Sequence, residues 1–89
     1  MALPVPGLAQ GTVDIDGIAV PNRSLSRDEV VALSGLRDDT AAAEVLILSR
    51  ACSITEDEAR EWRTKVNAAT AGLLLSEIAA LSGLDRGNA

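Results

Sequence analysis

The dipeptide Asp16-Gly17 constrains the start of this chain more than any other feature, because it stands between two short runs of alternating apolar residues, 12–15 and 18–20. A two-residue hairpin loop with a type I′ turn needs positive φ at both central positions, and Asp-Gly meets this need. Pairing across the turn puts four apolar side chains on one face: Ile15 with Ile18 and Val13 with Val20. The pattern predicts a β-hairpin over 12–20 that Pro21 ends and that must pack on other elements.

Two matching signals mark helix starts farther along the chain. Ser26 with Glu29, and Thr55 with Glu58, each have the Ser/Thr-x-x-Glu spacing of a capping box. In such a box the hydroxyl and the carboxylate accept bonds from backbone N–H groups that the first helical turn leaves unpaired. The signals predict helices over about 26–35 and 55–66.

Two further apolar segments are also predicted to be helices. Residues 45–48, Val-Leu-Ile-Leu, are apolar in every direction, which suits either a buried helix or a buried strand. The three alanines at 41–43 favour a helix, over about 40–51. Residues 68–82 carry a wide apolar stripe, and Gly83 follows where a helix commonly ends in a left-handed residue.

These segments together predict a mainly α fold: a small N-terminal β-hairpin followed by a compact bundle of about four short helices. The chain has 89 residues, which fits one domain with a modest core. We assign that domain to 11–84, after a flexible lead-in at 1–10 and before a polar tail at 85–89. Aromatic residues make up only 1% of the chain, so the core must consist of aliphatic side chains.

Charge and composition argue against several classes of function. The formal net charge is −5 without a basic stripe, which disfavours binding to nucleic acid. Arg60, Arg63 and Lys65 alternate with carboxylates and indicate a solvated helix face. No apolar stretch approaches the roughly 20 residues of a membrane span, and the N-terminus lacks the regions of a secretion signal. The single cysteine, Cys52, is expected to be a small packing residue in a reducing cytosol.

Catalytic and metal sites are not predicted. The chain has no histidine to activate Cys52 or a serine. The acidic clusters at 38–39 and 56–58 fall at predicted helix starts, where carboxylates suit the helix dipole. The segment 14–17, Asp-Ile-Asp-Gly, has the first part of a calcium loop but none of the later ligands. We therefore expect a non-enzymatic protein without a cofactor or a bound metal.

Four apolar residues are candidates for partner binding. Leu73 and Ala80 fall opposite the apolar stripe of helix 68–82, so they either form a partner surface or pack against a second neighbour. Trp62 aligns with core residues, but tryptophan is also common at interface hot spots. Leu84 is the apolar residue that follows the helix-ending Gly83.

The order of these features resembles the tail assembly chaperones of long-tailed bacteriophages. Members of that family have a β-like segment with a turn, a Leu-Ser/Thr-Arg-x-Glu helix start and an acidic linker. An apolar helix, a Thr-x-x-Glu cap leading to Trp, and a closing apolar helix follow. The resemblance spans about residues 12–84, and these residues carry it: Leu25, Ser26, Arg27, Glu29, Leu46, Leu48, Thr55, Glu58, Trp62, Leu81, Ser82, Gly83 and Leu84.

The resemblance implies a function in phage tail assembly. Such a protein binds the helical, aggregation-prone tape measure protein and helps to recruit the tail tube protein. It acts in the cytoplasm of the host bacterium and is absent from the finished virion, and many such genes also yield a frameshifted, longer form. On this basis the face with Leu73 and Ala80 is expected to serve either tape measure binding or self-association.

Two other functions stay open at this point. One is a small acidic interaction module, such as an antitoxin or regulator, which would need a tail that folds on binding or a basic DNA-reading helix. The other is a structural head–tail connector. Gene order separates them, because a tail assembly chaperone gene should lie between the tail tube and tape measure genes.

Overall fold

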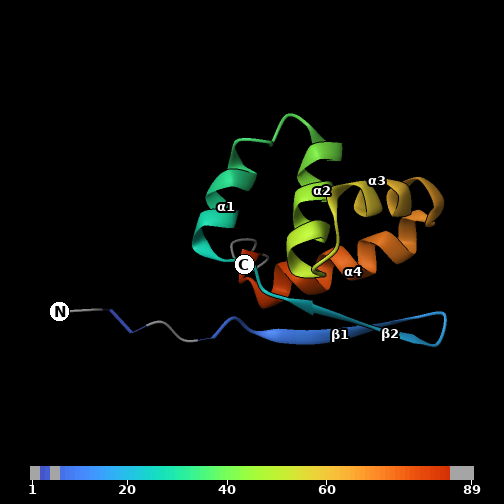
Figure 1. Ribbon diagram of the computed structural model, residues 1–89, viewed down its shortest axis with the longest axis horizontal. Coiled ribbons are helices and arrows are strands. Elements are labelled where there is room, and N and C mark those ends of the chain that lie inside the picture. Colours follow the sequence, from blue (N-terminus) through green and yellow to red (C-terminus); the bar gives the residue numbers. More distant parts are fainter. Residues whose placement is uncertain (1–2, 5–6, 85–89) are drawn as a thin grey trace.

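The computed structural model describes residues 3–4 and 7–84, which fold as a hairpin followed by four helices (Figure 1). The elements are β1 (Gln10–Ile15), β2 (Ile18–Arg23), α1 (Arg27–Ser34), α2 (Thr40–Ala51), α3 (Glu56–Lys65) and α4 (Ala68–Leu81). The hairpin runs along one side of the helices, α4 packs over it, and α2 and α3 lie on the far side of α4. This arrangement confirms the fold class that the sequence predicts.

The turn of the hairpin has the predicted geometry. Asp16 has φ of 53° and Gly17 has φ of 80°, as a type I′ turn requires. The register pairs Ile15 with Ile18 and Val13 with Val20, as expected from the sequence. Val13 is buried against the helices, whereas Ile18 beside the turn is 67% exposed. The apolar face of the hairpin is therefore covered at its base and open at its tip.

The hairpin is longer than the sequence predicts, because Pro21 does not end β2. The strands pair from Gln10 with Arg23 to Ile15 with Ile18. In an antiparallel pair, hydrogen-bonded and non-hydrogen-bonded residue pairs alternate, and a two-residue loop is closed by a hydrogen-bonded pair. Pro21 lies opposite Thr12, in a non-hydrogen-bonded pair, so its nitrogen points away from β1. The proline therefore removes no hydrogen bond from the ladder.

The helix ends match the capping signals. In both boxes, Ser26 with Glu29 and Thr55 with Glu58, the hydroxyl and the carboxylate each accept a backbone hydrogen bond. Asp39 caps α2 by accepting a hydrogen bond from the N–H of Ala42. Residues 45–48 lie within α2, so they form a helix and not a strand. After α4 the chain turns at a left-handed glycine, Gly83, with φ of 75°.

The core is aliphatic and lies where α2, α3, α4 and β1 meet. Its buried apolar residues are Val13, Leu25, Val45, Leu48, Ala51, Ala59, Leu74 and Ile78. Ile78 is fully buried, which confirms that α4 turns its predicted apolar stripe inward, and Ala59 is buried on the side of α3 that faces the core. Of the segments predicted outside the domain, residues 1–2, 5–6 and 85–89 lie outside the described part of the chain.

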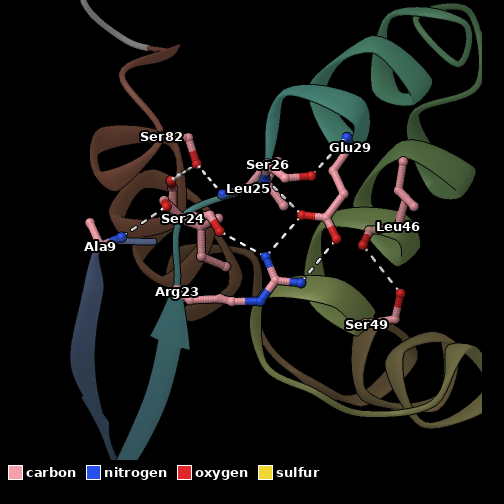
Figure 2. A network of polar contacts seen from close by, with 10 residues as sticks. Ala9, Arg23, Ser24, Leu25, Ser26, Glu29, Leu46, Ser49 and Ser82 are labelled. Atoms are coloured by element: carbon pink, nitrogen blue, oxygen red, sulfur yellow. Dashed lines mark hydrogen bonds and ion pairs between the residues drawn. The ribbon is translucent and has the colours of Figure 1, made fainter. Parts of the chain in front are cut away.

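A polar network fastens the base of the hairpin to α1 and α4 (Figure 2). Arg23 at the end of β2 makes a two-pronged ion pair with Glu29, at 2.8 and 2.9 Å, while Glu29 also caps α1. Nearby, the N–H of Leu25 donates to the hydroxyl of Ser82 at 2.8 Å. The segment between β2 and α1 is therefore bonded both to the start of α1, through Glu29, and to the end of α4, through Ser82.

Removal of Arg23 tests this network and makes a pH-dependent prediction. The hydrogen-bonded Arg23 guanidinium, together with hydrogen bonds from Ser26 to the Glu29 carboxylate, lowers the pKa of Glu29 from 4.5 to about 2. Because the pKa of Glu29 is lower in the folded state, the stabilisation of the fold by the ionised Glu29 is complete above pH 4.5 and is lost as the pH falls towards 2. In urea unfolding at pH 7, Arg23→Gln should cost about 1–2 kcal/mol, since the pair is partly exposed.

The matched control is Arg60→Gln, which breaks only the exposed pairs with Glu56 and Asp57 on α3. Its cost should stay within about 0.5 kcal/mol. The difference in the free energy of unfolding between wild type and Arg23→Gln should shrink as the pH approaches 2. If the difference in unfolding free energy were the same at pH 7 and near pH 2, the ion pair could not be the cause of that difference.

Candidate partner-binding surfaces

An apolar groove lies between the outer half of the hairpin and the helices. Its volume is about 440 Å³, and we call it the hairpin groove. It exists because the hairpin extends past the helices that cover its base, so that the face carrying Ile15, Ile18 and Val20 is only partly covered. The lining residues are Ile15, Ile18, Ala19, Val20, Pro21, Leu48, Cys52, Ile54, Glu58, Trp62 and Leu74.

Trp62 is the aromatic residue of this groove. It comes from α3, is partly buried and packs against the core cluster. The sequence leaves open whether Trp62 is a core residue or an interface anchor, and its position combines both surroundings. One part of the side chain contacts the core, and another part lines the groove.

The polar groups of the groove are few. Burial raises the pKa of the Cys52 thiol, which keeps it protonated, and Cys52 packs against the core as expected. Glu58 is the charged side chain among the lining residues. Hydrogen bonds from Thr55 lower the pKa of Glu58, so the carboxylate is ionised at neutral pH. The groove is therefore an apolar surface with one negative charge.

A second hollow, of about 580 Å³, follows β1 beside α4, and we call it the β1–α4 hollow. It contains two of the candidates, Leu73 and Ala80, which both face outward from α4; Leu73 is 57% exposed. Both side chains are exposed rather than buried against a second neighbour. The complete lining is Thr12, Val13, Asp14, Leu73, Ser76, Glu77 and Ala80.

The four candidate residues thus fall in three places. Leu73 and Ala80 share the β1–α4 hollow, Trp62 lines the hairpin groove, and Leu84 is 40% exposed just after α4. Sequence reasoning missed Ile18, which it assigned to a packed face. Its position next to the turn was the available signal, because this end of the hairpin is the farthest from the segment that continues into α1.

The basic residues of α3 do not form a positive patch. Each pairs with a carboxylate: Arg63 with Glu44 at 2.8 Å, Lys65 with Glu61 at 3.4 Å, and Arg60 with two residues of the first turn of α3. This agrees with the predicted solvated helix face. In the part of the chain that the structure describes, no group of three or more acidic or thiol side chains could hold a metal ion. None of the helices in residues 7–84 has both the length and the apolar character of a membrane span.

Comparisons of the chain with protein-family models, with curated proteins and with solved structures give no significant match. The function must therefore be inferred from the two surfaces and from the order of features along the sequence.

Proposed function

We propose that this protein is a tail assembly chaperone of a long-tailed bacteriophage, and that it holds the tape measure protein in the hairpin groove. The observation that carries the proposal is the groove itself, an open apolar surface between Ile18 on the hairpin and Trp62 on α3. Exposed apolar surface of this kind is typical of binding sites for other proteins. The family resemblance in residues 12–84 adds the identity of the partner.

The groove suits one face of an amphipathic helix. A helix-in-groove complex buries apolar side chains at spacings of three and four residues in a hydrophobic channel. A volume of about 440 Å³ has room for a few such side chains but not for a whole helix. The partner helix would therefore lie across the opening, with its apolar stripe against Ile18, Val20 and Trp62 and its polar face in solvent.

Charge supports the same role. The carboxylate of Glu58 at the groove favours a partner whose apolar stripe is flanked by Lys or Arg. The net charge of −5 also gives the chaperone and its complexes a mutual repulsion that opposes aggregation. Both properties suit a protein that keeps a long helical partner in solution.

The family resemblance also implies where and when the chaperone would act. The chaperone would act in the host bacterial cytoplasm, bring the tail tube protein to the loaded tape measure protein, and leave before the virion is complete. The hairpin groove would be occupied by the tape measure protein at that stage. The tail tube protein would then need a different surface of the chain.

Co-expression with the tape measure protein encoded beside it tests this function. We expect a soluble complex in size exclusion with light scattering, with several copies of this chain on each tape measure protein. The gene should also lie between the tail tube and tape measure genes. A tape measure protein that stays insoluble while this chain elutes alone would contradict the proposal.

A further inference from the structure

The two edges of the hairpin differ in what they offer to another strand. On β1 the backbone N–H and C=O groups of Gln10, Thr12 and Asp14 point away from β2, because these residues occupy non-hydrogen-bonded pairs. On the outer edge of β2, Pro21 has no N–H to donate. Among the described residues no strand pairs with the outer edge of β1. The β1 edge is therefore open to strand addition, whereas Pro21 blocks the β2 edge.

Exposed apolar side chains lie beside the open edge. The β1–α4 hollow has Thr12 and Asp14 on one side and Leu73 and Ala80 on the other. A strand that pairs with β1 would bring its own neighbouring elements against this face of α4. Backbone hydrogen bonds and apolar burial would then come from a single docking event, as in other complexes formed by strand addition.

We propose that the occupant is a second copy of this chain, with its β1 antiparallel to the first across a two-fold axis at Thr12. This register places Thr12 opposite Thr12 and the Gln10 amide, a hydrogen-bond donor, opposite the Asp14 carboxylate. A register centred on Asp14 would instead bring two carboxylates together. Of these two registers, the one centred on Thr12 avoids an Asp14–Asp14 contact and also uses the whole strand from Gln10 to Asp14.

The spacing of the helices fits this dimer. A two-fold axis perpendicular to the sheet leaves both copies of α4 on the same face of a joined, four-stranded sheet. Each copy of α4 packs over two strands (Figure 1), which span about 9.6 Å at roughly 4.8 Å per strand. Packed helices lie about 8–10 Å apart. The small side chains of Ser76 and Ala80 permit the closer end of that range, and Leu73 meets the partner helix. The carboxylate of Glu77, on the same face, reaches back over β1 at Gly11.

The dimer is closed by its symmetry. The same surface is used by both copies, so the contact saturates after one pairing. The outer strands of the joined sheet are then both β2, and each carries Pro21 on its free edge. This explains why an edge strand with a proline lies beside an edge strand without one. The β1–α4 hollow is distinct from the hairpin groove, so self-association leaves the proposed tape measure site accessible.

The test is Thr12→Pro, measured by sedimentation equilibrium of the full chain. The substitution removes one outward N–H and no hydrogen bond within the hairpin, because Thr12 faces Pro21 in a non-hydrogen-bonded pair. We expect a wild-type dimer and at least about a tenfold weaker dimer in the variant. The matched control is Ala19→Pro, which removes an outward N–H from the already blocked β2 edge and should leave the dimer unchanged.

A second pair of variants protects the test against a folding defect in Thr12→Pro. Leu73→Asp charges the exposed face of α4, and Val31→Asp makes the same change on α1, where Val31 is 51% exposed. Only Leu73→Asp should weaken the dimer. A wild-type chain that stays monomeric at high concentration would overturn the proposal, as would a dimer that tolerates Leu73→Asp.

Discussion

Replacing Ile78 with alanine is expected to lower the free energy of unfolding by about 2–5 kcal/mol. Ile78 is fully buried in the core, on the face of α4 that packs over the hairpin and against α2. The substitution removes buried methyl and methylene groups and leaves a cavity that rigid neighbours fill only in part. Small domains have a total stability of about 5–15 kcal/mol, so the loss is a large fraction of it.

Urea unfolding followed by circular dichroism measures this loss. The matched control is Ile18→Ala, the same chemical change at a position that is 67% exposed, with an expected cost below about 1 kcal/mol. The loss in free energy of unfolding for Ile78→Val should lie between those of the two alanine variants, at about 0.5–1.5 kcal/mol. This variant keeps the burial of position 78 measurable if Ile78→Ala does not fold. Equal costs at positions 78 and 18 would show that the core is not where the structure places it.

Replacing Ile18 with aspartate is expected to have the largest effect on function. Ile18 lies in the hairpin groove, next to a turn, and is largely exposed in the free protein. A carboxylate at this position would face the apolar stripe of the docked helix and would lose its hydration there. We expect at least about a hundredfold loss in affinity for the tape measure protein.

Co-expression and size exclusion provide the readout for Ile18→Asp. The tape measure protein should become insoluble, while the variant itself remains folded by circular dichroism, because an exposed position changes stability little. Val31→Asp is again the control, since it charges an exposed apolar residue outside the hairpin groove. A complex of unchanged composition with Ile18→Asp would move the binding site away from this groove.

The features that the sequence predicts correctly are those fixed by neighbouring residues. The turn at Asp16-Gly17 and the capping boxes at Ser26 and Thr55 depend on contacts within four residues. Gly83 at the end of α4 is another local signal. The outward position of Leu73 also follows from helical periodicity alone.

The features that it misses depend on register or on packing between distant segments. Pro21 disrupts a strand only if its nitrogen faces the partner, and that is decided by the pairing with β1. The ion pair of Arg23 with Glu29 joins the end of a strand to a helix cap, and no periodicity connects those positions. Neither the hairpin groove nor the β1–α4 hollow could be predicted, because each is formed by strands and helices far apart in sequence.

The emission of Trp62 is the most direct measurement of whether the hairpin groove receives a partner helix. It is the one tryptophan of the chain, and it lines the groove. The probe is a tryptophan-free synthetic peptide that carries an apolar stripe of the tape measure protein. Binding should shift the emission to shorter wavelength and reduce quenching by acrylamide, and Ile18→Asp should abolish both changes. A peptide that binds while the emission and quenching of Trp62 stay constant would contradict the account.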